Sequence, residues 1–95
     1  MLTSKQRARL RGMANTLQPL TQIGKGGVSP AVAAQASAML EAHELIKLAV
    51  LDAADMTARE ACGELCAACG AEPVQVIGNR LVIFKKRAED SKFDL

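Results

Sequence analysis

The first part of the chain carries one stripe of side chains at helical spacing. Four residues recur at three- or four-residue steps, which predicts a helix over residues 3–17 that buries one face. Thr3 or Ser4 can cap its first turn, because either hydroxyl can accept a hydrogen bond from a free backbone amide. The stripe consists of Gln6, Leu10, Met13 and Leu17.

The next segment combines a short strand, a glycine turn and a second helix. Residues 18–23 are typical of a strand, which Pro19 confines to an edge or a strand start because proline has no amide donor. The sequence Gly24-Lys25-Gly26-Gly27 then interrupts the pattern. Ser29 as cap and Pro30 in the first turn predict a helix that runs to about residue 43. Its expected buried residues are Val32, Ala36, Met39, Leu40 and His43.

The second half of the chain predicts three more strands and one more helix. Residues 45–51 are almost continuously apolar, with only Lys47 interrupting them, which predicts a central strand covered on both faces. A loop over residues 52–56 leads to a third helix over residues 57–69, which Gly70 ends. Residues 73–77 and 81–84 are strands rich in Val and Ile. The dipeptide Gly78-Asn79 supplies the hairpin turn between them.

This order of elements predicts one fold class. Strands separated by helices favour parallel crossovers, whereas the final hairpin is antiparallel. We therefore expect an α/β (α+β) fold with α-β-α-β-α-β-β order and a mixed four-stranded sheet packed with helices. The 95 residues form a single compact domain in this interpretation, and the polar residues 85–95 form a frayed tail.

Charge is unevenly distributed, although the net charge is only +2. Residues 1–30 contain five Lys or Arg and no acidic residue, residues 31–79 have a net charge of −5, and residues 80–95 have a net charge of +2. Such segregation favours a polyanionic partner. The aromatic residues are Phe84 and Phe93 alone, so stacking of single-stranded bases has little support.

Several protein classes are disfavoured by the same sequence. No apolar stretch approaches the roughly 20 residues of a membrane span, and the N-terminus lacks the apolar core of a signal peptide. Three closely spaced cysteines do not resemble a secreted disulfide framework. We therefore expect a cytoplasmic protein with no membrane partner.

The glycine turn is a candidate phosphate site. A glycine-rich turn before a helix exposes backbone amides near the positive end of the helix dipole, and Lys25 adds a cation. It is not a Walker loop, because Gly26 follows the lysine where Ser or Thr would stand. The alternative stays open that these glycines only provide the conformational freedom of a tight turn.

The first helix is strongly basic. Four cations within seven residues, unopposed by any carboxylate, favour contact with a nucleic-acid backbone over simple solvation. At helical spacing they flank both sides of the buried stripe. They are Lys5 and Arg9 on one side, and Arg7 and Arg11 on the other.

Catalytic and metal chemistry find little support. The C-x3-C-x2-C spacing of Cys62, Cys66 and Cys69 matches the cluster motif of radical SAM enzymes, but here it falls inside a helical pattern that predicts core cysteines and no cofactor. The single histidine, His43, has no nucleophile motif near it and is expected to cap or pack at a junction. We expect a protein that is not an enzyme and has no small-molecule substrate.

Segments along the whole chain resemble the YhbY-type proteins, whose fold is the CRM domain (chloroplast RNA splicing and ribosome maturation). The matching segments are Leu2–Gln6, Leu10-Arg11, Leu17–Pro19, Ile23–Val28, Leu40–Lys47, Gly70-Ala71, Val74–Asn79 and Leu81–Phe84.

This resemblance implies a fold similar to the C-terminal domain of translation initiation factor three. It also implies structured RNA as the partner, with ribosomal RNA and the precursor of the large ribosomal subunit as the expected target. We further expect the protein to be a monomer. In the family the GxxG loop and the neighbouring basic surface are held to contact RNA. Carried over to this sequence, with Arg80 added from the basic C-terminal segment, the candidate RNA-binding residues are Lys5, Arg7, Arg9, Arg11, Gly24, Lys25, Gly26, Gly27 and Arg80.

Two alternatives remain. The acidic middle of the chain could instead join a ribosomal particle through a basic protein, and its candidate residues are Glu41, Glu44, Asp52 and Asp55. A metal enzyme that uses the three cysteines is the weaker alternative.

Overall fold

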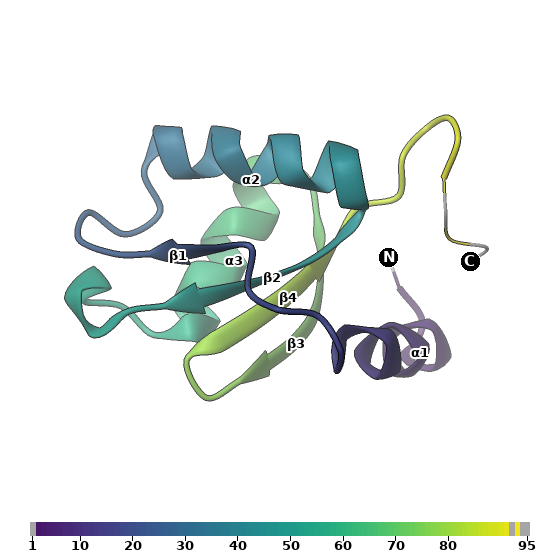
Figure 1. Cartoon of the computed structure of the whole chain (residues 1–95), viewed down its shortest axis with the longest axis horizontal. Helices are drawn as coiled ribbons and strands as arrows, with labels where there is room; N and C mark the ends of the chain where they lie inside the picture. The colour runs from purple at the N-terminus through teal and green to yellow at the C-terminus, as the bar shows by residue number, and fades with distance from the viewer. Residues whose placement is uncertain (1, 92, 94–95) are drawn as a thin grey trace.

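The sheet of this protein is built from four strands in the order β1-β2-β4-β3. The computed structural model describes residues 2–91 and 93. Within them the chain forms α1, β1, α2, β2, a 3-10 turn, α3, β3 and β4 in sequence (Figure 1). Their bounds are α1 Ser4–Ala14, β1 Thr21–Ile23, α2 Pro30–His43, β2 Leu45–Val50, the 3-10 turn Asp52–Ala54, α3 Ala58–Cys69, β3 Glu72–Ile77 and β4 Arg80–Phe84.

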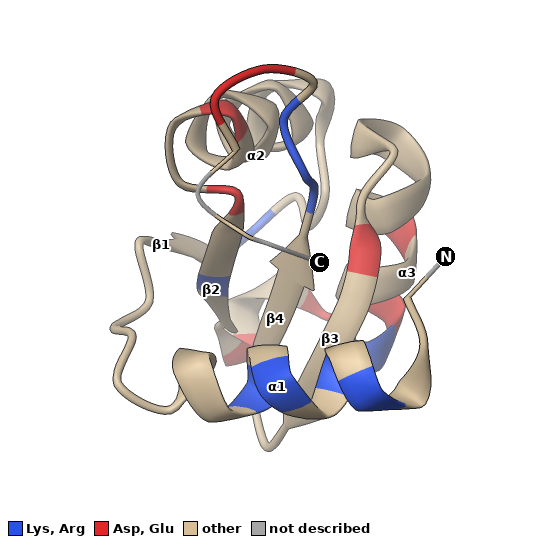
Figure 2. Ribbon diagram, turned by 90° about the vertical axis from the view of Figure 1, so that its right-hand side faces the viewer, with Lys and Arg blue, Asp and Glu red and all other residues tan. Residues whose placement is uncertain are grey.

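The predicted mixed topology is confirmed. Strand β1 runs parallel to β2, and β4 is antiparallel to both of its neighbours, β2 and β3. Helices α2 and α3 cover one face of the sheet, and α1 crosses the other face (Figures 1 and 2). The sheet is therefore the middle layer of three.

Alternation along β2 explains why its sequence is almost continuously apolar. Ile46 and Leu48 are fully buried beneath α2 and α3, in a cluster that also contains Ile23 and Leu65. Leu45 points to the opposite face and packs with residues of α1 and β4. Near its start, β2 is covered on both sides of the sheet, as predicted, and needs apolar residues in both registers. Lys47, further along the strand, is partly exposed on the α1 side. The α1-side cluster consists of Leu10, Ala14, Leu45, Val74, Val82 and Phe84.

Local signals in the sequence set most of the element boundaries. The Thr3 hydroxyl accepts a hydrogen bond from the Gln6 amide, and the Ser29 hydroxyl accepts one from the Val32 amide. Gly70 ends α3 with a φ of +68°, and Gly78 adopts +58° in the hairpin turn. Caps and turns are thus placed where the sequence predicted them.

The prediction for α1 was wrong over its last turn. The helix ends at Ala14, and the Leu17 amide then donates to the Ala14 carbonyl in a turn. Leu17 still reaches the α1-side cluster, which is why its spacing imitated a helical stripe. Met13 is 44% exposed, and the Gln6 side chain turns back to accept a hydrogen bond from the Thr3 amide.

Two further expectations need correction. The predicted strand over residues 18–23 is reduced to Thr21–Ile23, because Pro19 cannot donate and pairing begins when the Leu20 amide reaches the Lys47 carbonyl. His43 is exposed at the end of α2 rather than buried.

No helix of residues 2–91 is long and apolar enough to cross a membrane.

The described part of the C-terminal tail makes specific contacts, although we expected it to be frayed. The Arg87 amide donates to Glu44 Oε2 over 3.0 Å. The ring of Phe93 packs edge-on against that of Phe84, with centroids 5.1 Å apart. These contacts hold the tail beside the end of α2. The same expectation for residues 92, 94 and 95 lies outside the described residues.

Candidate nucleic-acid interface

The glycine loop lies between β1 and α2, at one end of the long axis (Figure 1). Gly26 and Gly27 have φ values of +96° and +61°, which L-residues rarely adopt. A Cβ added to Gly27 would lie only 3.0 Å from Met56 Sδ. The backbone conformation of the turn therefore requires glycine at these two positions. This agrees with the interpretation that the glycines provide the conformational freedom of a tight turn.

The loop also leaves backbone donors unused. The Gly27 amide donates to the Gly24 carbonyl and the Ser29 amide to the Gly27 carbonyl. Among the described residues, the amides of Lys25, Gly26 and Val28 find no acceptor. Lys25 is exposed beside them, at the N-terminus of a 14-residue helix. Free amides, a cation and a helix dipole together can accept an anion.

One side of this loop is acidic. A shallow hollow joins the glycine loop to Asp55 and Met56, which lie between the 3-10 turn and α3, and to Glu60 and Glu64 of α3. A hydrogen bond from the Thr57 backbone amide, with a smaller contribution from the Thr57 side chain, lowers the pKa of Glu60, so its carboxylate stays charged at neutral pH. A polyanion approaching over α3 would meet repulsion. The favourable approach to the loop is from the side away from α3.

The cations of α1 differ in what they contact. Lys5, Arg9 and Arg11 are exposed. Arg7 is only partly exposed, and its Nε donates to the Pro73 carbonyl over 3.3 Å. Arg7 thus helps to hold α1 against β3, which the sequence did not predict.

The loop and α1 lie at opposite ends of the sheet. Helix α1 packs on Leu45 at the start of β2, whereas the glycine loop follows Ile23, which pairs with Val50 at the end of β2. Five residues of strand separate the two positions by about 17 Å, at roughly 3.3 Å per residue. The two predicted groups are therefore not one continuous patch.

Arg80 and Lys47 lie between these two ends. Arg80 pairs with Ala49, and Lys47 pairs with Val82, on the face of the sheet that α1 partly covers. Arg80 is a predicted site residue, but Lys47 was passed over because it interrupts an apolar strand. That interruption was the available signal, because a lone charge in a central strand is uncommon.

The acidic residues of the alternative interface do not form one surface. Glu44 is completely buried and pairs with Arg87, so it cannot meet a protein partner. Asp52 and Asp55 lie at the glycine-loop end, and Glu41 lies near the far end of α2. The exposed carboxylates that do gather are those beside the glycine loop.

The cysteines pack along α3. Cys62 and Cys69 are buried, as predicted, in the core cluster that α3 forms with α2 and the sheet, and Cys66 is partly buried. The hydrogen bond between the thiols of Cys62 and Cys66 lowers the pKa of Cys62 and raises the pKa of Cys66. Among the described residues, no three His, Cys, Asp or Glu side chains are placed to hold a metal ion.

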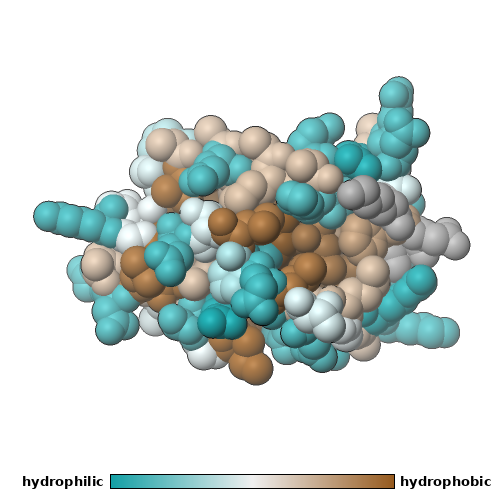
Figure 3. Space-filling view, viewed as in Figure 1, coloured by the Kyte–Doolittle hydropathy of each residue, from teal (hydrophilic) through white to brown (hydrophobic). Residues whose placement is uncertain are grey.

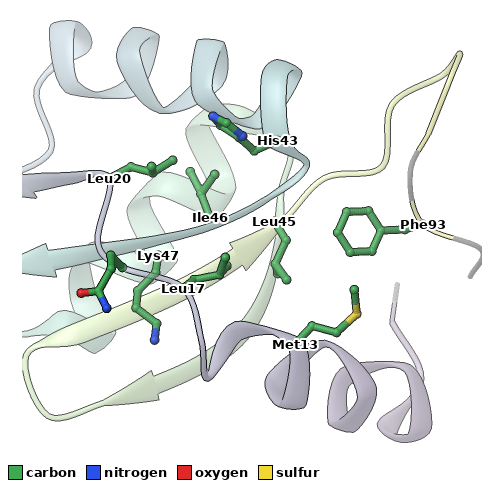
Figure 4. A pocket seen from close by; sticks show the side chains of 9 residues that line it. Met13, Leu17, Leu20, His43, Leu45, Ile46, Lys47 and Phe93 are labelled. Carbon is green, nitrogen blue, oxygen red and sulfur yellow. The ribbon is translucent and has the colours of Figure 1, made fainter.

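A separate apolar hollow of about 200 Å³ lies between α1 and the end of α2. Its apolar lining forms the brown area near the middle of Figure 3. His43 lies at its rim with Leu20, Met13 and Phe93 (Figure 4). In the part of the chain that the structure describes, the lining contains no Ser, Thr or Cys side chain that could pair with His43 as nucleophile and base.

The sequence of residues 2–85 matches the CRS1 / YhbY (CRM) domain. The chain belongs to this family. Its residues 86–95 follow the CRM domain and include the tail segment that contacts Glu44.

Relatives of this CRM chain match it from end to end. The probable RNA-binding protein YqeI of Bacillus subtilis is 38% identical, and the match covers 100% of this chain and 99% of YqeI. An RNA-binding protein of Haemophilus influenzae is 33% identical, covering 99% and 94% of the two chains. The solution structure of the hypothetical protein SAV1595 from Staphylococcus aureus superposes with a TM-score of 0.80 at 37% identity, covering 100% and 99%. The predicted family and fold class are confirmed.

Proposed function

We propose that this CRM chain is a non-catalytic protein that binds structured RNA. The observation that carries the proposal is the glycine loop at the N-terminus of α2. Lys25 and Gly26 are exposed in it, and among the described residues the amides of Lys25, Gly26 and Val28 have no acceptor. Phosphate oxygens suit such donors, and the exposed cations of α1 would secure neighbouring backbone. The names of the relatives, a probable RNA-binding protein and an RNA-binding protein, agree with this chemistry.

The proposed contact residues come from three elements. The loop contributes Gly24, Lys25, Gly26 and Gly27, α1 contributes Lys5, Arg9 and Arg11, and β4 contributes Arg80. Arg7 acts mainly by holding α1 on β3. The five exposed cations in this set would make about five phosphate contacts, which gives a log–log salt slope of about −3.5 to −4.5.

Ribosomal RNA, within the precursor of the large ribosomal subunit, is the target we propose. Support comes from the family itself, whose name refers to ribosome maturation. The protein would act in the cytoplasm as a monomer, with neither a cofactor nor a small-molecule substrate. Its part would be to hold an RNA segment during assembly of the particle.

The deciding experiment measures binding to protein-free large-subunit ribosomal RNA by fluorescence anisotropy between about 50 and 300 mM KCl. Over this range, binding through phosphate contacts weakens steeply as the salt concentration rises. An unrelated structured RNA of equal length is the control. Tighter binding to ribosomal RNA with a steep salt slope is expected. A flat salt response would contradict the electrostatic mechanism, and equal affinity for both RNAs would contradict the ribosomal target.

One observation favours a second candidate function. Asp55, Glu60 and Glu64 gather in the hollow beside the glycine loop and could meet a basic protein. In that case the chain would join ribosomal particles through a protein partner, and it would bind the particle but not the protein-free RNA.

A further inference from the structure

Helix α1 covers only one end of its face of the sheet. The register of β2 and β4 places Leu45 opposite Phe84, and these two residues pack beneath α1 together with Val82 of the next row. Beyond them, two further rows of side chains continue along the same face toward the hairpin and the glycine loop. The first row is Lys47, Val82 and Gln75, and the second row is Gln22, Ala49, Arg80 and Ile77.

These two rows present donors and no carboxylate. We call the polar side chains Gln22, Lys47, Gln75 and Arg80 the open strip. Gln22 and Arg80 are exposed, and Lys47 and Gln75 are partly exposed. Within residues 2–91 and 93, none of these four side chains makes a hydrogen bond or an ion pair. The strip is therefore a set of unused donors on one face.

Lys47 is the residue whose position most needs an explanation. It lies in a central strand, its neighbours Ile46 and Leu48 are fully buried, and its side chain is partly buried without a carboxylate partner. Figure 4 shows its side chain leaving β2 on the same side as Leu45 and opposite to Ile46. Removing a cation from water without a partner costs free energy. A ligand that brings its own negative charge to this face would offset that cost.

We propose that the open strip contacts the backbone of an RNA duplex that spans from α1 to the glycine loop. This inference rests on the proposed RNA-binding function and adds the shape of the RNA and three contact side chains, Gln22, Lys47 and Gln75, beside Arg80. A ligand held at both ends must cross about 17 Å of sheet. Lys47 and Arg80 lie in that interval, and Gln22 and Gln75 flank them.

Two observations favour a duplex over a single strand. Single-strand binders stack bases on aromatic side chains, but here the two phenylalanine rings pack on each other and Phe84 is buried. A duplex instead offers phosphates and 2′-hydroxyls across its wide, shallow minor groove, which cations and amide side chains can contact. The acidic hollow on the α3 side of the loop also directs the RNA to the α1 side.

The first test removes one charge from the strip. Lys47→Gln keeps much of the aliphatic stem, and Arg59→Gln removes the same charge from α3 on the other face of the sheet. With an RNA duplex of about 20 base pairs, Lys47→Gln should weaken binding about fivefold and lower the salt slope by about 0.8, while Arg59→Gln changes both much less. Thermal melts establish that each variant is folded. Equal effects of the two substitutions would overturn the strip.

The second test addresses the amides. The double variant Gln22→Ala, Gln75→Ala should lose affinity for the RNA duplex but keep its affinity for a DNA duplex of the same sequence, because only RNA carries the 2′-hydroxyl. Gln35→Ala, on α2, is the matched control. Parallel loss for RNA and DNA, or tighter binding of the single strand than of the duplex, would overturn the inference. Lys25→Glu separates the two proposals: if it abolishes binding while the strip variants bind normally, RNA binding stands and the strip fails.

Discussion

The buried carboxylate of Glu44, at the end of α2, lies 3.6 Å from Nε of Arg87 in the C-terminal segment. The Arg87 backbone amide and the Ser91 hydroxyl donate hydrogen bonds to the same carboxylate, and Arg87 Nη1 donates to the Glu41 carbonyl. At 3.6 Å the Nε contact is an ion pair rather than a hydrogen bond. Glu44 therefore fastens the segment that follows β4 to the helix that precedes β2.

Breaking this pair should destabilise the protein. Arg87→Ala leaves the Glu44 carboxylate buried with less compensation, and we expect a loss of about 3 kcal/mol in the free energy of unfolding. Urea denaturation followed by circular dichroism measures it. Arg59→Ala, an exposed cation, is the control and should change stability by less than about 0.5 kcal/mol. Similar values for the two variants would contradict a structural role for the pair.

The glycine loop should tolerate a charge change only at selected positions. Gly26→Asp is a poor probe, because a φ of +96° strains any side chain. A Cβ at Gly24 would make only ordinary contact, 3.8 Å from Leu51 Cδ1. The pair Gly24→Asp, Lys25→Glu should therefore abolish RNA binding while the melting temperature stays within a few degrees. Gly24→Ala is the steric control, and unchanged affinity in the charged variant would reduce the loop to a turn.

The four cations of α1 should separate into two classes. Arg11→Gln removes an exposed cation, so it should lower the salt slope of RNA binding by about 0.8 without changing stability. Arg7→Gln also removes the hydrogen bond to the Pro73 carbonyl, so it should cost about 1 kcal/mol of folding free energy. Salt titrations and urea denaturation of both variants test this contrast. Identical behaviour would show that the contact with Pro73 contributes nothing.

Sequence patterns predicted those parts of the fold that depend on local chemistry. Ser29 caps α2, Gly70 ends α3 and Gly78 turns the hairpin, because each requirement arises within a few residues of its position. The parallel and antiparallel pairing followed from the order of the elements. Leu17 shows the limit: it packs with the α1-side cluster from a turn, and apolar spacing does not distinguish a turn from one more helical turn.

The candidate site was predicted in its parts but not in its arrangement. Lys25 and the cations of α1 were identified, yet their separation depends on which end of β2 each one meets. The pairing of Lys47 with Val82, and the approach of Glu64 to the glycine loop, join residues far apart in the sequence. Such contacts are set by strand register and helix packing, which a single sequence does not reveal.

The cysteines of α3 should behave as core residues. Cys62→Ser buries a hydroxyl and should cost about 1 to 3 kcal/mol in the free energy of unfolding, and Cys66→Ser should cost less because this side chain is partly exposed. A chelator should leave the melting temperature unchanged. Native mass spectrometry should give the mass of the chain alone. A bound metal or cluster would instead support the alternative that the chain is a metal enzyme that uses the three cysteines.

The capping box of α3 should give the protein a defined response to acid. The Thr57 amide donates to the Glu60 carboxylate over 2.9 Å, and the Thr57 hydroxyl accepts from the Glu60 amide. The hydrogen bond from the Thr57 amide is the largest cause that lowers the pKa of Glu60, so the folded chain binds this proton less readily than the unfolded chain does. The stabilisation is then complete above the unfolded-state pKa of about 4.3, and it is lost as the pH falls through the lowered pKa of the folded state.

Glu60→Gln should therefore differ from the unmodified protein in its free energy of unfolding at pH 7 but much less near pH 3. Glu64→Gln, one turn further along α3 and outside the box, should show no comparable change with pH, and parallel curves for Glu60→Gln and the unmodified protein would refute the assignment.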